Sequence, residues 1–170
     1  MKTRVRADGG CREAMAEHLQ AIMVDVEYLA FGVDHACWNM VGDDAVQLAA
    51  ELNGVRQRCF AIAGQIAASE RALGQFPDAR PETVTRDSHG WYIPDGPLDT
   101  TLVRTGASAR LFQVASWARE PLGISEAAVH HDTRVLLDDV AQQLEEEARS
   151  IESAPRPPAR SESTSLTAKE

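Results

Sequence analysis

Cysteine and aromatic side chains are scarce in this sequence, and long apolar runs are missing from it. The three cysteines, Cys11, Cys37 and Cys59, form an odd and scattered set, which excludes a disulfide framework and a zinc knuckle. Aromatic residues make up 5% of the chain and hydrophobic residues 44%, so a core has to be built mainly from aliphatic side chains. No apolar run approaches the roughly 20 residues that span a bilayer, and the first ten residues lack the apolar segment of a secretory signal. We therefore expect a cytoplasmic protein without a membrane partner.

Negative charge outweighs positive charge. The 170 residues include 17 Lys and Arg against 26 Asp and Glu, which gives a formal net charge of −9. Such a chain is repelled by phosphate backbones unless it concentrates positive charge locally. A small basic cluster, Lys2, Arg4 and Arg6, lies near the N-terminus. The composition argues against DNA as a partner, and stress-related DNA binding through this cluster is kept as an alternative function.

Apolar residues recur at spacings of three and four in four separate segments, as they do on the buried face of a helix. The segments run from Arg12 to the glycine at 42, from Asp44 to Leu73, over 99–119 and over 125–152. The first two are joined by a short turn, so their helices have to lie antiparallel. The pattern predicts an all-α protein, an antiparallel four-helix bundle.

The remaining segments set the domain limits. We expect residues 1–10 to form a flexible arm, 11–153 to form the bundle, and 154–170 to form a disordered tail, because that tail is rich in Pro, Ser, Thr and Arg. Segment 75–97 interrupts the helical pattern with prolines and glycines. It predicts a long crossover between the second and third helices.

The crossover contains two adjacent aromatic residues, Trp91 and Tyr92. A connection of this length is uncommon in a compact domain and usually carries function or a short extra element. The simpler interpretation is that both rings pin the crossover to the bundle.

Residues 34–42 read DHACWNMVG, and this segment resembles a known motif. Trp38, Asn39 and Gly42 stand where the Dps family of mini-ferritins carries an HWN-x-x-G segment near the end of its first helix. The resemblance covers roughly residues 15–152 and is weakest in the crossover. It implies a ferritin-like bundle that assembles into a hollow, closed dodecamer. It also implies the family's activities, which are oxidation and storage of iron and, in many members, DNA binding through basic arms.

The resemblance further implies an iron site at a subunit interface, and the sequence departs from it at every ligand. The family places His on helix one, His and Asp early on helix two, and Asp and Glu later on helix two of the other subunit. The corresponding positions here are Cys37, Ala49, Asn53, Gly64 and Ala68. Alanine and glycine carry no donor atom, and the amide of asparagine is a poor substitute for the carboxylates and imidazoles that bind iron. We expect no cofactor, with iron as the exception if the family activity persists.

A relocated metal site is the enzyme alternative. Asp34 and His35 lie close to Cys37 in the sequence and are the best remaining ligands. The bundle-core di-iron site of true ferritins requires a Glu-x-x-His motif, which is absent from the chain. An iron-oxidising mini-ferritin with a displaced site would have to use such substitutes.

The start of the last predicted helix offers two weaker candidates. His130 and His131 are adjacent, so they point about 100° apart on a helix and cannot chelate one ion together. Asp132 lies near the region that lines the three-fold pores of the family, where a ring of three copies would attract cations.

These observations lead to one main hypothesis. We expect a homo-oligomeric shell protein that lacks the usual iron-oxidation site and acts as a structural or binding protein, either alone or co-assembled with an active relative. The sequence gives no shell size, partner or cargo.

Overall fold

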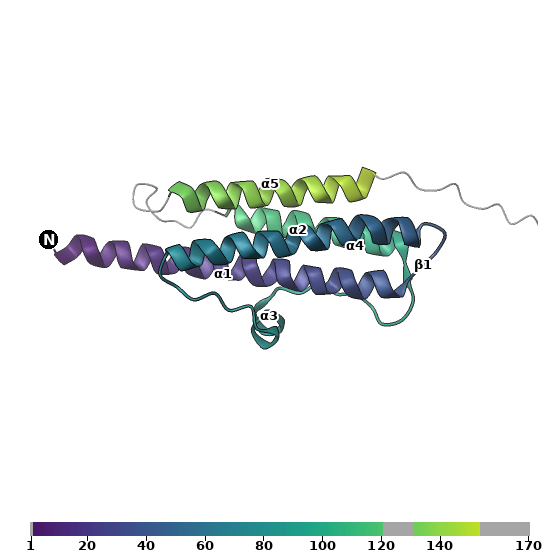
Figure 1. Cartoon of the computed structure of the whole chain (residues 1–170), viewed down its shortest axis with the longest axis horizontal. Helices are drawn as coiled ribbons and strands as arrows, with labels where there is room; N and C mark the ends of the chain where they lie inside the picture. Colours follow the sequence, from purple (N-terminus) through teal and green to yellow (C-terminus); the bar gives the residue numbers. More distant parts are fainter. Residues whose placement is uncertain (1, 121–130, 154–170) are drawn as a thin grey trace, which may run out of the picture.

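Four long helices form the body of the molecule and run side by side (Figure 1). The structure is a computed structural model that describes residues 2–120 and 131–153, with the side chains from residue 10 onward. The long helices are α1 (Lys2–Asn39), α2 (Ala45–Ala72), α4 (Thr100–Ala118) and α5 (His131–Ser153). A short helix, α3 (Pro81–Asp87), lies in the crossover and projects from the side of the bundle. The all-α, antiparallel four-helix architecture with a long crossover is confirmed.

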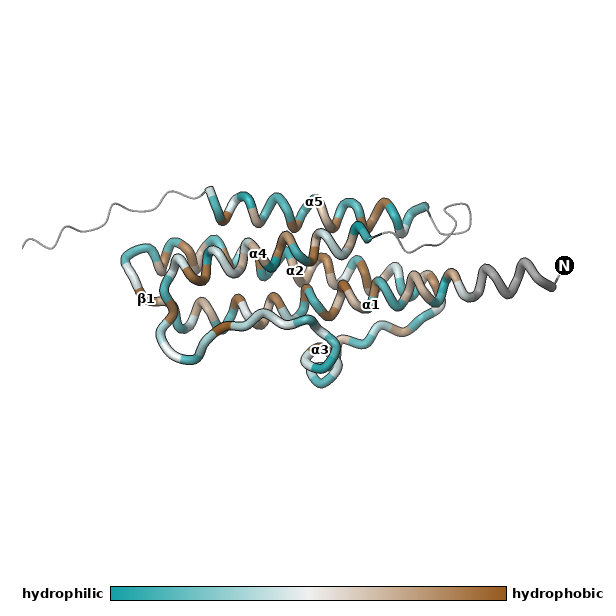
Figure 2. The backbone as a smooth tube through the Cα atoms, turned by 180° about the vertical axis from the view of Figure 1, so that it is seen from behind, coloured by the Kyte–Doolittle hydropathy of each residue, from teal (hydrophilic) through white to brown (hydrophobic). Residues whose placement is uncertain are grey.

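The core lies between the long helices and is almost entirely aliphatic. Its largest fully buried side chains are Leu19, Ile22, Met23, Leu29, Leu48, Leu52, Ile62, Ile66, Leu98, Leu111, Leu137 and Leu144. Hydrophobic and hydrophilic residues alternate along the long helices (Figure 2), and the buried ones are mostly hydrophobic. Cys59 is buried among them, as expected for a small hydrophobic side chain. Within the described residues, no helix combines the length and the apolar character that crossing a membrane requires.

The turn between α1 and α2 is tied to the end of the crossover. Strand β1 (Met40–Val41) pairs in parallel with strand β2 (Leu98–Asp99), with Met40 opposite Leu98. Gly42 follows with a φ of +130°, a conformation that favours glycine. The apolar periodicity did not predict this ladder, because two residues per strand are too few to produce an alternating pattern.

Aspartates stand at the N-terminal ends of α2 and α4, but they act differently. Asp99 caps α4 by accepting hydrogen bonds from the backbone N–H groups of Thr101 and Leu102. Asp44 occupies the N-cap position of α2 but makes no side-chain cap hydrogen bond. It accepts a hydrogen bond from the Thr100 hydroxyl instead, at 2.6 Å, so it joins α2 to α4.

The first helix begins earlier than predicted. We expected it from Arg12, and α1 is continuous from Lys2. Its first turns carry almost no apolar residues, so a reading based on apolar periodicity misses them. Whether segment 1–10 is a flexible arm stays a prediction. The expected start of the last helix at 125 and the tail 154–170 lie outside the described residues.

Candidate functional site

The positions that the resemblance assigns to iron binding lie on the α1–α2 hairpin. Residues 49, 53, 64 and 68 recur on one side of α2, where Asn53, Gly64 and Ala68 are exposed and Ala49 is half-buried. Cys37 of α1 faces this helix, since its thiol lies 3.9 Å from the Ala49 carbonyl oxygen. The structure therefore brings Cys37 close to the early α2 positions, residues 49 and 53. Of these three side chains, Cys37 ends in a sulfur atom, Asn53 ends in an amide, and Ala49 has no donor atom.

A cation of the protein itself lies next to these positions. The Arg56 Nε is 3.3 Å from the Asp34 carboxylate, and another Arg56 nitrogen donates to the Asn53 side-chain oxygen at 2.8 Å. The Asp34 carboxylate thus has an ion-pair partner. A positive guanidinium at this place opposes a metal ion by charge repulsion.

The other candidate ligands are not arranged around a common point. The His35 ring lies 3.5 Å from the Asn39 side-chain nitrogen, and that nitrogen also donates to the His35 carbonyl at 2.8 Å. Burial, and then the Asp34 charge, raises the pKa of the Cys37 thiol, which keeps it protonated at neutral pH. Across residues 10–120 and 131–153, no three His, Cys, Asp or Glu groups lie close enough to hold a metal ion.

The same hairpin exposes aromatic side chains. Phe31 is 45% exposed, Trp38 is 77% exposed and Phe60 is 41% exposed. Phe31 and Trp38 lie seven residues apart on α1, so they share the face that carries Asp34. Phe60 lies between Asn53 and Gly64 on α2, on the same side of the helix as these two residues. We call this surface, defined by Phe31, Trp38 and Phe60, the hairpin face.

A buried ion pair lies on the opposite side of α1, and no motif in the sequence predicts it. Asp25 and Arg110 are both almost fully buried, and their side chains are 2.5 Å apart. The crossover contributes His89, whose backbone N–H donates to Asp25 Oδ1 and whose Nδ1 lies 2.9 Å from Asp25 Oδ2. One aspartate therefore joins α1, α4 and the crossover. The available signal was a single acidic residue inside the apolar run MVDV.

Aromatic rings close this ion pair off from the side. Arg110 stacks over Trp117 at 4.8 Å, and the His89 ring lies 4.2 Å from the same indole. Burial lowers the pKa of the Arg110 guanidinium, and the Asp25 charge opposes that effect. Asp25 is paired with both Arg110 and His89, whereas Arg110 Nε has no hydrogen-bond partner among the described residues. The Asp25 contacts therefore hold the crossover against the bundle.

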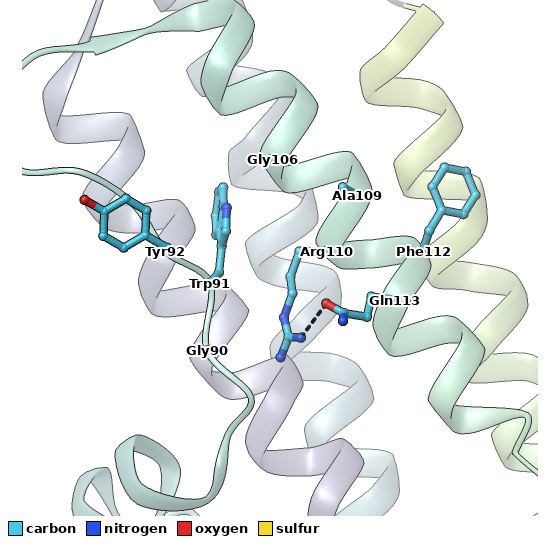
Figure 3. Close-up of a pocket in the computed structure, with 8 residues that line it drawn as sticks. All are labelled: Gly90, Trp91, Tyr92, Gly106, Ala109, Arg110, Phe112 and Gln113. Atoms are coloured by element: carbon cyan, nitrogen blue, oxygen red, sulfur yellow. Dashed lines mark hydrogen bonds between the residues drawn. The ribbon is translucent and has the colours of Figure 1, made fainter.

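A shallow pocket adjoins the ion pair between the crossover and α4 (Figure 3). Figure 3 shows Trp91 turned toward α4 near Gly106, and Arg110 donating a hydrogen bond to Gln113 at 2.9 Å. Within the part of the chain that the structure describes, the lining contains no carboxylate, histidine or cysteine. It offers no ligand set for a metal and no general base.

The two crossover aromatics have different environments. Trp91 packs against the core, as predicted. Tyr92 is 88% exposed, so the expectation that it also pins the crossover is wrong. Trp91 already occupies the space between Gly32 of α1 and Gly106 of α4, which leaves no place there for a second ring.

The interior of the bundle holds an arginine toward one end. Arg104 is 4% exposed, lies 3.2 Å from Glu51 and also donates to the Ile151 carbonyl. Glu51, the α2 carboxylate nearest the early ligand positions, is therefore already paired. This arrangement does not favour a di-iron site at that end of the core.

The structure locates some of the remaining candidate residues but does not test their roles. His131 and Asp132 begin α5 and are exposed, and a pore ring of Asp132 would require further copies of the chain. Lys2, Arg4 and Arg6 lie in the first turns of α1, and their side chains are outside the described part. His130 also lies outside it.

Comparison with known proteins identifies the fold. No family model and no curated protein matches the chain. Among solved structures, the Dps92 protein of Deinococcus radiodurans is 22% identical, with a TM-score of 0.78 over 84% of this chain and 86% of that one. A Dps homologue of Halobacterium salinarum is 23% identical, with a TM-score of 0.75 over 84% of this chain and 79% of that one.

A third similar structure is the Dps protein of Vibrio cholerae, described as a member of a broad superfamily of ferritin-like diiron-carboxylate proteins. It is 12% identical, with a TM-score of 0.76 over 85% of this chain and 90% of that one. Identities this low establish the fold alone. This chain therefore has the ferritin-like four-helix-bundle fold of the Dps mini-ferritins, as the WN-x-x-G resemblance implied.

Proposed function

We propose that this protein is a Dps-like shell subunit of the cytoplasm that has lost the family's interfacial iron-oxidation site and acts as a structural or binding protein. The observation that carries the proposal is the chemistry of the α1–α2 hairpin. Of the five positions assigned to iron ligands, Ala49, Gly64 and Ala68 have no donor atom. The Arg56 guanidinium pairs with the nearest carboxylate, that of Asp34.

Fe(II) and Fe(III) need several carboxylate or imidazole donors around one point. The hairpin offers one neutral amide and one protonated thiol at those positions, together with a positive charge. A second copy of this chain would bring the same residues, so dimerisation alone does not restore the set. These facts support a non-catalytic role over a relocated oxidation centre.

The hairpin face supports assembly. Exposed aromatic side chains gathered on one surface are typical of protein–protein interfaces, where tyrosine, tryptophan and phenylalanine are enriched. Phe31, Trp38 and Phe60 satisfy this description. A second copy of the chain is the occupant that the Dps fold favours, and an active relative with the same fold is the alternative.

Sedimentation velocity with the full chain tests assembly. We expect the wild type to sediment as a closed oligomer and Phe60→Glu to dissociate, because a buried carboxylate without a partner is costly at an interface. Phe76→Glu is the matched control, since Phe76 is 79% exposed but lies after α2, away from the hairpin face. A monomeric wild type, or equal dissociation of both variants, would contradict the proposed interface.

A further inference from the structure

A small pocket between α1 and the end of α2 has an unusual charge. Its volume is about 220 Å³. Its lining consists of Glu13, Ala16, Glu17 and Gln20 of α1, Glu70 of α2, and Gln75 and Phe76 after the end of α2. Three of these side chains are carboxylates. The pocket belongs neither to the hairpin face nor to the crossover pocket of Figure 3.

Glu70 is the feature that points to a ligand. The residue is only 2% exposed, and its Oε1 atom has no hydrogen-bond partner among the described residues. Burial raises the pKa of its carboxyl to about 7. A buried polar atom without a partner is rare in proteins and calls for an explanation. Glu70 is one of the residues that line the pocket, so its carboxyl group adjoins the cavity.

The basic residue next to Glu70 in the chain is directed elsewhere. Arg71 follows Glu70 in the chain, but its guanidinium lies over the Phe76 ring at 4.0 Å and donates to the Gln75 carbonyl at 2.9 Å. The other charged groups in the lining, Glu13 and Glu17, are negative and exposed. Among the described residues, the lining of this pocket therefore contains three acidic side chains and no basic one.

We propose that this pocket binds an aliphatic diamine, with one ammonium group on the Glu70 carboxylate and the other at the mouth beside Glu13 and Glu17. An ammonium carries three N–H donors and a positive charge, which match an unpartnered carboxylate. Ala16 and the Phe76 ring provide apolar surface for the methylene chain between the two ammonium groups. A directly coordinated metal ion fits less well, because no three acidic groups in the described part lie close enough to hold one.

The proposal predicts that binding depends on proton release. An ammonium group binds the ionised form of Glu70, so a protonated carboxyl has to lose its proton first. The affinity should therefore rise with pH through neutrality. The diamine keeps both of its charges over this range, because alkyl amines have pKa values near that of lysine, about 10.4.

Isothermal titration calorimetry of the full chain with 1,4-diaminobutane tests the proposal. We expect saturable binding at pH 8 and an affinity about tenfold lower at pH 6, where a group with a pKa of about 7 is mostly protonated. Glu70→Gln keeps the size of the side chain but removes its charge, and it should lower the affinity at least tenfold. Glu17→Gln, at the mouth, should lower it less.

Glu146→Gln is the matched control, because Glu146 is an exposed α5 residue outside the pocket and its substitution changes the net charge equally. It should bind the diamine like the wild type. The proposal is overturned if no saturable binding occurs at pH 8 or if Glu70→Gln binds as tightly as the wild type. It is also overturned if magnesium chloride binds as tightly as the diamine and loses its affinity in the same variants.

Discussion

The Trp91 indole lies between two glycines, Gly32 and Gly106. This packing predicts that replacing Gly32 with alanine destabilises the protein when Trp91 is present and stabilises it when Trp91 is replaced. A methyl group added at Gly32 would lie 2.6 Å from Trp91 Cε3 and 3.2 Å from Ile93 Cδ1. A methyl group at Gly106 would lie 2.9 Å from Trp91 Nε1. Contacts this short force the ring or a helix to move. The two glycines therefore make room for the residue that anchors the crossover.

The magnitudes follow from two opposing effects of Gly32→Ala. Alanine favours a helix over glycine by about 1 kcal/mol, and overpacking a filled site costs about 1–3 kcal/mol. We expect a net loss of stability of up to about 2 kcal/mol in the wild-type background. Truncating a buried tryptophan costs about 3–5 kcal/mol, and Trp91 is only half-buried, so Trp91→Ala should cost about 2–3 kcal/mol. In the Trp91→Ala background the clash with the indole is gone and only the milder 3.2 Å contact with Ile93 remains, so Gly32→Ala should instead stabilise by up to about 1 kcal/mol.

Urea unfolding followed by circular dichroism measures all four proteins of this cycle. The protein concentration has to be fixed, because assembly shifts apparent stability. Gly54→Ala is the matched control: Gly54 is a helical glycine of α2 with no atom within 4 Å of an added Cβ, so it should stabilise by about 1 kcal/mol in both backgrounds. An equal effect of Gly32→Ala with and without Trp91 would refute the packing argument.

The remaining predictions concern charges. Asp25→Ala leaves the Arg110 guanidinium buried without its partner, so it should lower the free energy of unfolding in urea by about 3–5 kcal/mol. Asp34→Ala breaks an ion pair in which about a third of each side chain is exposed, so it should lower that free energy by at most about 1 kcal/mol. Equal losses in the two variants would contradict this ranking. The raised pKa of Glu70 means that the folded state binds more protons than the unfolded state between pH 4.5 and about 7, so stability falls as the pH rises through that window. Glu70→Gln should therefore stabilise the fold by up to about 3 kcal/mol at pH 8. In thermal unfolding this gain in stability should decrease as the pH is lowered toward 4.5. A gain that does not depend on pH would contradict the raised pKa of Glu70. We expect no gel shift of duplex DNA at about 150 mM salt, and a salt-sensitive shift that disappears on deletion of residues 1–6 would favour the DNA-binding alternative.

The helices were the predictable part of this fold. Their apolar stripes repeat over many turns, so the limits of α2 and α4 agree with the expected ranges within a residue or two. Gly74 follows the end of α2 with a positive φ, as a glycine after a helix often does. Gly42 also has a positive φ, but α1 ends three residues before it, at Asn39, and strand β1 comes between them. The start of α1 was not predictable from the same signal, because its first turns have no apolar face.

The contacts between distant segments were not predictable. The sequence around Asp25 does not indicate a partner for its carboxylate. In the folded chain the crossover places His89 beside it and α4 places Arg110 beside it. Trp91 and Tyr92 are adjacent in sequence, and only the positions of Gly32 and Gly106 decide which ring is buried. For the candidate site, the sequence indicated which donor atoms are missing, but not that Arg56 pairs with Asp34.

Oxidation of Fe(II) tests the central claim most directly. The wild type is titrated with Fe(II) without oxygen, then given oxygen or hydrogen peroxide while the ferric absorbance is recorded. It is compared with a variant that restores the family's donors, whose substitutions are Cys37→His, Ala49→His, Asn53→Asp, Gly64→Asp and Ala68→Glu. We predict that the wild type oxidises iron no faster than buffer and retains none, and that the restored variant gains both activities. Fast oxidation with retained iron in the wild type would contradict the account.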